Sequence, residues 1–306
     1  MHMIVLWGVM EDPPLAAVYD RLRECGAPVI LIDQRRIREY RFESTLSDGL
    51  LEGEISWPSG RLDLGNVTAI YARPYDFRQL PAFRGADRAS EQLASAARFE
   101  DGMLLWCELA EAVVVNRPSA MASNSSKPYQ SELIKSCHFL IPDTLITTDP
   151  SQVTKFLDLH GQIIYKSISS RRSIVSKVTD VELDRVTEVE ACPTQFQQFI
   201  PGLDYRAHVL GTQVYCQRIL STADDYRYGS ETAIAPAELP PDIRERCVVL
   251  AKQLGLAFAG IDLRETPDSE WFCFEVNPSP GYTYFEGACG ELTDALATYL
   301  AARSNH

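Results

Sequence analysis

The sequence lacks the motifs that mark several common enzyme classes. It contains no GxGxxG, so a dinucleotide site after its first strand is not supported, and no HExxH or GxSxG, so hydrolase functions lack support. No apolar run approaches the roughly 20 residues that a membrane span needs. The first residues also lack the basic and long apolar regions of a signal peptide. We therefore expect a cytoplasmic protein with no membrane partner.

The cysteines and the charge balance exclude further classes of ligand. The 8 cysteines include no CxxC, which argues against structural zinc, and this many scattered thiols suit a reducing cytosol. Acidic residues number 42 and basic residues 29, which gives a net charge of −13. Because such a surface repels a phosphate backbone on average, we expect no nucleic-acid partner. Any bound anion must be held by a local basic cluster.

The N-terminal third of the sequence predicts a parallel α/β unit. Residues 3–7 form an apolar run, Pro13 and Pro14 can open a helix that reaches about residue 25, and residues 28–32 form a second apolar run. A strand, a helix and a strand in this order are typical of parallel sheets. The pattern then predicts a strand at 69–72, a helix at about 87–112 and a strand at 113–116.

The pattern changes beyond Pro118, and we expect the main boundary between residues 116 and 125. Asn124, Ser125 and Ser126 form an N-cap cluster for a helix at about 127–137. Further expected elements are a strand at 142–148, a helix at 151–160, a strand at 163–168, two strands on either side of Gly211 and Thr212, a helix at 241–254, and strands at 257–263 and 271–276.

Two late strands carry oxygen ligands at matching positions. Asp262 lies in GIDLR, and Glu275 and Asn277 lie two residues apart in FEVNP, so that the last two side chains share one strand face. If the strands pair through the turn at 266–269, all three side chains converge. Carboxylate and amide oxygens suit Mg²⁺, which usually keeps waters and shares phosphate oxygens. The alternative is a pair of acids exposed to solvent at a strand end.

A basic cluster lies upstream of these strands. Lys127 begins a helix, and Lys166 lies inside the apolar strand IIYKSI, where an ammonium without a partner is costly. The next segment, SISSRRS, offers hydroxyls, backbone N–H groups, and Arg171 and Arg172, which could cover a phosphate tail. The alternatives are a strand lysine whose ammonium reaches water and a solvated pair of arginines.

The order of these motifs resembles the ATP-grasp superfamily, and within it the RimK-type carboxylate–amine ligases. The matching segments are NSSKPYQSELIKSCHFLIPDTLIT, IIYKSISS, FQQFIPGLDYRAHVLG, GIDLR and FEVNPSPG, which cover roughly residues 116–290. The resemblance implies an α/β protein with α+β subdomains. It places an N-terminal parallel α/β pre-ATP-grasp domain at 1–118 and an ATP-grasp region at 119–306, which comprises a central subdomain at 119–192 and a C-terminal subdomain at 193–306.

The resemblance also implies a role for each matching residue. Lys127 and Lys166 match the two lysines that contact nucleotide phosphates. Residues 197–200, which we call the hinge segment, match the segment whose backbone recognises adenine. Asp204 falls near the ribose. The implied nucleotide-binding residues are Lys127, Lys166, Ser169, Arg172, Gln197, Gln198, Phe199, Ile200 and Asp204. The implied metal ligands are Asp262, Glu275 and Asn277, and Arg206 matches an arginine expected near the phosphate or acyl-phosphate.

The sequence departs from the family pattern at three places. SISSRRS contains no glycine, although this loop is usually glycine-rich in the family, so we expect Arg171 or Arg172 to supply part of the phosphate binding. Gln198 stands where RimK-type members often have an acid. The segment ADDYRYG, with Asp225 and Arg227, is similar to an Asp-aromatic-Arg segment of peptide-macrocyclising ATP-grasp ligases, and Arg227 is the second candidate catalytic residue.

The resemblance implies an ATP-dependent carboxylate–amine ligase. A substrate carboxylate would attack the γ-phosphate to give an acyl-phosphate, and an amine would then displace phosphate to form an amide. The expected cofactors are ATP and Mg²⁺, with Mn²⁺ as a possible substitute, and the expected substrate is an amino acid, another small molecule or a peptide; a homodimer is compatible with the family. Two alternatives remain, a small-molecule kinase that uses the same nucleotide site and a nucleotide-binding scaffold.

Overall fold

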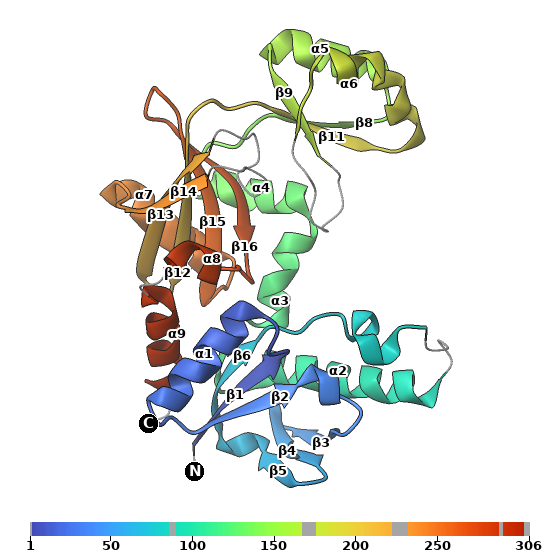
Figure 1. Ribbon diagram of the computed structural model, residues 1–306, viewed down its shortest axis with the longest axis vertical. Coiled ribbons are helices and arrows are strands. Elements are labelled where there is room, and N and C mark those ends of the chain that lie inside the picture. The colour runs from blue at the N-terminus through green and yellow to red at the C-terminus, as the bar shows by residue number, and fades with distance from the viewer. Residues whose placement is uncertain (1, 86–89, 167–175, 222–231, 288–289, 303–306) are drawn as a thin grey trace. The chain divides into compact units, whose positions relative to one another are not determined.

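A computed structural model describes residues 2–85, 90–166, 176–221, 232–287 and 290–302 (Figure 1). The chain divides into two compact units. The first comprises Met1–Met121, Gly255–Phe258 and Pro278–His306, and the second comprises Ala122–Leu254 and Ala259–Asn277. The junction after Met121 lies inside the range where we expected the main boundary. The division at residues 118 and 192, which concerns functional modules, stays a prediction.

A parallel sheet forms the centre of the first unit, with strand order β2-β1-β6-β7. The Asp12 side chain caps the first helix by accepting a hydrogen bond from the Leu15 amide (3.3 Å), and two prolines follow at the positions where a missing N–H costs nothing. The predicted strand–helix–strand opening is confirmed, since both neighbours of β1 run parallel to it. The elements are β1 (Met3–Gly8), α1 (Pro13–Glu24), β2 (Val29–Asp33), β6 (Val67–Ala72) and β7 (Val113–Val115).

Helix α2 (Glu91–Leu109) supplies much of the core of this unit and is shorter than the expected 87–112. Its Ser90 N-cap accepts a hydrogen bond from the Leu93 amide (3.4 Å), which sets the first turn. Phe99, Met103 and Trp106 recur at helical spacing and are buried. A short helix, α3 (Pro118–Met121), ends the N-terminal segment of the unit.

A three-stranded antiparallel sheet in the first unit was not expected from the sequence. It contains β3 (Arg41–Ser47), β4 (Leu50–Trp57) and β5 (Gly60–Asp63). Asp48 and Gly49 make its first turn with positive φ values of 52° and 83°, the conformation of tight hairpin turns. Most side chains of β3 are exposed on both faces, so the period-2 burial pattern that identifies strands is weak here.

Two polar side chains attach the returning C-terminal segments to the first unit. Asn116 is buried and accepts hydrogen bonds from the amides of Ala257 (2.8 Å) and Phe258 (3.0 Å), and it donates to the Pro278 carbonyl (2.6 Å). Arg73, paired with Asp12, donates to the Pro280 carbonyl (3.1 Å). The segment continues as α8 (Thr283–Glu286) and α9 (Glu291–Ala301), and α9 packs beside α1 (Figure 1).

The second unit begins with α4 (Lys127–Ser136) and contains two antiparallel sheets. The smaller sheet has the order β10-β9-β11-β8 and packs with α5 around Val153, Ile163, Val189 and Phe196. Its elements are β8 (Thr144–Thr147), α5 (Pro150–His160), β9 (Ile163–Lys166), β10 (Ser176–Lys177), α6 (Asp180–Asp184) and β11 (Thr194–Gln198).

The larger sheet of the second unit has the order β14-β13-β12-β15-β16. The predicted hairpin around Gly211 and the predicted pairing of the two late strands are both present. Its elements are β12 (Leu203–Leu210), β13 (Gln213–Ser221), β14 (Thr232–Ala237), α7 (Pro241–Gln253), β15 (Phe258–Glu265) and β16 (Trp271–Asn277). Among the helices of the described ranges, none combines the length and the apolarity that a membrane crossing requires.

Candidate active site

The candidate metal ligands lie on one face of the β15–β16 hairpin. Asp262 is directly opposite Glu275 in the antiparallel register, and Asn277 is opposite Gly260. Cross-strand partners and residues two apart point to the same side of a sheet, so the three side chains share a face. A register irregularity directly after Asp262 raises the local twist where these groups meet.

The chemistry of this set fits a hard divalent cation. Two carboxylates and one carboxamide supply oxygen ligands, and no softer ligand is among them. In the described part of the chain, no three residues among His, Cys, Asp and Glu cluster as a metal site by themselves. An ion held here would therefore take its remaining ligands from water or from a bound phosphate, the mode that Mg²⁺ prefers.

Arg206 lies beside this face and is almost fully buried. It comes from β12, the strand next to β15, and its guanidinium forms an ion pair with the Asp262 carboxylate. The exposed fractions of the two side chains are 5% and 29%, so the carboxylate reaches solvent and the guanidinium scarcely does. His208 lies two residues further along β12. Burial, and next the charge of Arg206, lower the pKa of His208 well below its usual 6.5, so this imidazole is neutral near pH 7.

Arg264 joins the hinge segment to the same hairpin. Its Nε and Nη2 bind the two carboxylate oxygens of Asp204 at 2.7 and 2.8 Å, and its Nη1 donates to the Ile200 carbonyl at 2.7 Å. A forked guanidinium thus fixes both ends of the turn between β11 and β12. Asp204, predicted to lie near a ribose, is held in place by this pair, and its contact with ribose stays a prediction.

The backbone of the hinge has one donor left for a ligand. The amides of Gln198 and Phe199 donate to the carbonyls of Asp143 (2.9 Å) and Gln162 (3.0 Å). Within the described ranges, the Ile200 amide makes no hydrogen bond, and its residue is buried. A donor in an apolar surrounding needs a partner, and a heterocyclic nitrogen of a base could supply it.

Phe199 presents an aromatic ring between two cations. The Lys177 ammonium lies 4.5 Å from the ring centroid, and the guanidinium carbon of Arg264 lies 5.9 Å from it. The Arg264 guanidinium also lies 5.1 Å from the centroid of Phe274, a β16 residue. These contacts fix the ring orientation next to the hinge.

Lys166 begins a chain of polar contacts across the smaller sheet. Its ammonium donates to the side-chain oxygen Oε1 of Gln197 (3.1 Å), and the side-chain nitrogen Nε2 of Gln197 donates to the Thr144 hydroxyl (3.0 Å). The lysine is half-buried, as expected for a strand position. A neutral side-chain amide thus helps to orient the ammonium.

Gln130 ties the helix that carries Lys127 to the strand of the metal ligands. Its buried side chain donates to the Val276 carbonyl (2.8 Å) and accepts from the Val276 amide (2.9 Å). Val276 stands between Glu275 and Asn277, so this paired bond fixes the backbone between the two candidate ligands. Lys127, the first residue of α4, lies one turn before Gln130.

Comparison with known proteins finds ligases that are similar to this chain in sequence and fold. No family model matches the chain. A probable alpha-L-glutamate ligase of Aliivibrio salmonicida is 26% identical over 214 residues, which cover 65% of this chain and 70% of that protein. A second one, of Shewanella amazonensis, is 25% identical over 72% of this chain and 77% of its own length.

Solved structures extend the similarity over nearly the whole chain. The ATP-grasp ligase PsnB, solved with the precursor peptide PsnA2 and AMPPNP, is 26% identical, with a TM-score of 0.78 and coverage of 99% of this chain and 98% of PsnB. The macrocyclase MdnC of Microcystis aeruginosa, bound with its precursor peptide MdnA, has a TM-score of 0.81 at 23% identity and covers 99% of this chain and 100% of its own. The chain is an ATP-grasp ligase. The fold class and the ligase activity expected from the motifs are thereby confirmed.

Four predicted positions of this ATP-grasp ligase lie outside the described residues. Ser169, Arg171 and Arg172 belong to residues 167–175, and Arg227 belongs to residues 222–231. Their assigned roles stay predictions, as do the assignments of the individual described residues to ATP and metal.

Three residues that position the candidate site were not predicted from the sequence. Arg264 lies two residues after Asp262 in an apolar strand, so the same cost of burying a charge that singled out Lys166 could have identified it. Gln130 and Lys177 gave no such signal, because a polar residue on a helix or at a strand end is ordinarily solvated.

Proposed function

We propose that this ATP-grasp ligase binds ATP and Mg²⁺ at the face formed by β15, β16 and the hinge, and activates a carboxylate as an acyl-phosphate. The observation that carries the proposal is the register that sets Asp262 opposite Glu275 with Asn277 on the same face. PsnB has been solved with Mg and ADP, at 25% identity and a TM-score of 0.79, which supports the choice of ligands.

Each described residue has a role that its surroundings support. Asp262, Glu275 and Asn277 would hold Mg²⁺, which when bound neutralises phosphate charge. Lys127 and Lys166 would contact the phosphates, and the residues 197–200 would receive the base, with the Ile200 amide as donor. Arg206 stands beside Asp262 and would stabilise charge on the transferred phosphoryl group.

The two steps need no nucleophilic side chain. A carboxylate oxygen of the substrate forms a bond to the γ-phosphorus while the bond to ADP breaks. The amine nitrogen then bonds the acyl carbon, phosphate leaves, and the amine loses a proton to solvent or to the departing phosphate. The protein contributes orientation and charge neutralisation, which together can supply much of the rate enhancement.

We further propose a peptide substrate. MdnC and PsnB are bound to precursor peptides in their solved structures, whereas the similar glutamate ligases are named for an amino acid. The VanG D-Ala:D-Ser ligase of Enterococcus faecalis also covers 99% of this chain, but its TM-score is 0.60, against 0.81 for MdnC and 0.78 for PsnB. This higher structural similarity favours the peptide.

Product analysis tests the proposal. The enzyme is incubated with ATP, Mg²⁺, free glutamate and peptides that carry acidic side chains and a lysine, with the peptide carboxylates labelled by oxygen-18. We expect ADP, a peptide that has lost one water, and phosphate that has gained one labelled oxygen. A stable phosphorylated peptide would identify a kinase, and a gain of one glutamate residue would identify an amino-acid ligase. A homodimer, the use of Mn²⁺, the lack of nucleic-acid binding and a cytoplasmic location stay predictions from the sequence.

A further inference from the structure

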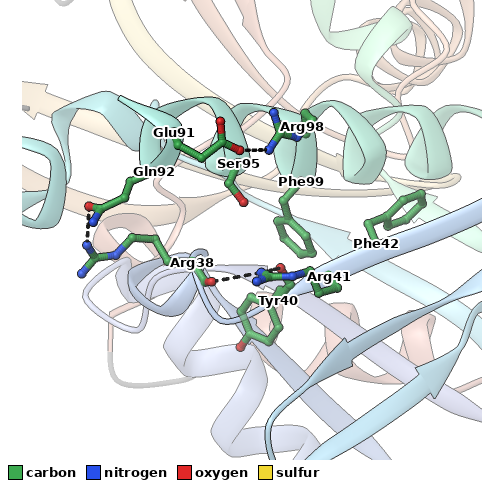
Figure 2. A pocket seen from close by; sticks show the side chains of 9 residues that line it. All are labelled: Arg38, Tyr40, Arg41, Phe42, Glu91, Gln92, Ser95, Arg98 and Phe99. Atoms are coloured by element: carbon green, nitrogen blue, oxygen red, sulfur yellow. Dashed lines mark hydrogen bonds and ion pairs between the residues drawn. The ribbon is translucent and has the colours of Figure 1, made fainter. Parts of the chain in front are cut away.

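A cavity of about 460 Å³ lies in the first unit, and its lining includes no residue that is assigned to the ligase reaction (Figure 2). It is formed by the N-terminal half of α2, by the first residues of β3 and by residues just before β3. Its lining combines three arginines with three aromatic residues. These six are Arg38, Arg41, Arg98, Tyr40, Phe42 and Phe99.

The floor of the cavity is apolar and rigid. Tyr40 and Phe99 are buried, and their rings stack with centroids 5.3 Å apart and an interplanar angle of 23°. The Phe42 ring lies directly on Gly102 of α2, where an added Cβ would be 2.6 Å from the ring. A glycine in mid-helix is unfavourable by about 1 kcal/mol relative to alanine, so its presence is explained by the ring that it admits.

The rim of the cavity is positively charged. Arg38 donates to the Gln92 side chain (2.9 Å), and Arg41 donates to the carbonyls of Arg38 (3.3 Å) and Tyr40 (3.2 Å). Across the described ranges, neither guanidinium has a carboxylate partner. Arg98 pairs with Glu91 at 2.5 Å, but the two side chains are 65% and 82% exposed, so this pair is weak.

The charge balance of the cavity opposes that of the whole chain. Three arginines and one glutamate leave a local surplus of two positive charges on a protein whose net charge is −13. The guanidinium groups supply forked hydrogen-bond donors at the entrance, and the aromatic rings supply an apolar surface beneath them. Pockets of a few hundred Å³ with this combination are typical small-molecule sites.

We propose that this cavity binds a small organic anion whose apolar ring rests on Tyr40, Phe42 and Phe99. Its carboxylate or phosphate head contacts Arg38 and Arg41. Arg98 joins them when the ligand displaces Glu91 from it. The site lies outside the proposed ligase reaction, so it would bind an additional ligand and not a reactant.

Isothermal titration of the full-length protein tests the proposal and identifies the head group. The probes are phenyl phosphate, 3-phenylpropanoate, inorganic phosphate and benzyl alcohol. We expect one of the two ring-bearing anions to bind, and to bind at least about tenfold more tightly than the two other probes. Inorganic phosphate lacks the apolar ring, and the uncharged alcohol lacks the charge-assisted hydrogen bonds. The anion that binds with the higher affinity shows whether the site selects a phosphate or a carboxylate head group. Absence of binding by both anions overturns the proposal.

Four variants locate the binding. Arg38→Ala and Arg41→Ala should each lower the affinity for the anion by roughly tenfold. Glu91→Gln should raise the affinity for the anion, because the competing carboxylate is removed from Arg98. Misfolding cannot produce such a gain of affinity. Gly102→Ala should weaken the ring-bearing anion, because the new methyl group pushes Phe42 into the cavity.

Arg61→Ala is the matched control, since Arg61 is an exposed arginine of the same unit outside the cavity. It should leave the affinity unchanged. An equal loss in Arg61→Ala and Arg41→Ala, or an unchanged affinity in Arg38→Ala and Arg41→Ala, would show that the anion is attracted by general surface charge and would overturn the site.

Discussion

Glu275 and Asp262 face each other across two strands, but their surroundings differ. Asp262 has the buried Arg206 as a partner, so its loss would leave a guanidinium that is 5% exposed without its counter-charge. Among the described residues, Glu275 forms no ion pair, although it lies at the same level of the hairpin. Glu275 is therefore the position at which a role in metal binding can be separated from a role in stability.

Glu275→Gln should abolish ADP formation and leave the melting temperature unchanged within about 2 °C. The neutral isostere removes charge that would balance the metal but almost no volume. ADP release at saturating Mg²⁺ and thermal unfolding are the two measurements. Glu270→Gln, an exposed residue at the turn of the same hairpin, is the control and should change neither. Normal ADP release by Glu275→Gln would mean that the metal set is misassigned.

Lys166→Met should weaken the binding of an ATP analogue by at least about tenfold without lowering the free energy of unfolding. Methionine fills the same space and has no charge to desolvate. Calorimetric titration of AMPPNP and denaturant unfolding report the two quantities. The matched variant is Lys155→Met, an exposed lysine on α5, which should keep full affinity. Reduced stability with unchanged affinity would assign Lys166 a purely structural role.

His208 should make stability depend on pH below about 6.5. Burial lowers its pKa in the folded state, so only the unfolded chain takes up the proton as the pH falls, and the folded state loses stability by up to about 1.4 kcal/mol per pH unit. Hydrogen exchange of the β12 amides at pH 5.5 and 7.5 measures this. His208→Gln should flatten the dependence, and His138→Asn, at an exposed histidine, should not. An identical pH dependence in His208→Gln and in the natural protein would contradict the account.

At the scale of secondary structure, Arg264 links the hinge to the metal hairpin. It binds Asp204 and the Ile200 carbonyl, and both partners in the ion pair are largely buried, with 16% and 24% of their side chains exposed. The orientation of the hinge therefore depends on a residue of β15, not on the turn alone. Arg264 would thereby let two separate sheets of the second unit contribute to the proposed nucleotide site.

Arg264→Ala should cost about 1.5–3 kcal/mol of stability and also weaken AMPPNP binding. In an Asp204→Ala background the same change should cost clearly less, because the carboxylate no longer remains without a partner. Denaturant unfolding of the four proteins in this cycle gives the coupling energy. Equal costs in both backgrounds would show that the pair contributes nothing to the hinge.

The sequence predicted those elements whose burial pattern is regular. The parallel opening of the first unit and the β15–β16 hairpin have alternating or continuous apolar runs with clear turns, and both are present. The sheet at residues 41–63 was missed because β3 has little buried surface. Lys166 was singled out by the cost of burying a charge, and Asp262 by oxygen ligands at matching positions of two strands, whereas the role of Gln130 depends on Val276, which is 146 residues away. Such partners cannot be chosen from local patterns.

At the scale of the whole molecule, the chain leaves the first unit and returns to it twice. The returning segments are held by the side chains of Asn116 and Arg73. No local signal predicts these contacts, because both residues look like ordinary ends of strands in the sequence. The consequence is that Asn277, the last residue of the second unit, is followed at once by the anchored Pro278.

We propose that ATP binds through a metal held by Asp262, Glu275 and Asn277. Calorimetric titration of AMPPNP with and without Mg²⁺ is the most direct test. In the natural protein, we predict that Mg²⁺ raises the affinity by at least about tenfold, or 1.4 kcal/mol. In Glu275→Gln, AMPPNP should bind weakly and equally in both conditions. A full Mg²⁺ effect in that variant, or none in the natural protein, would contradict the account.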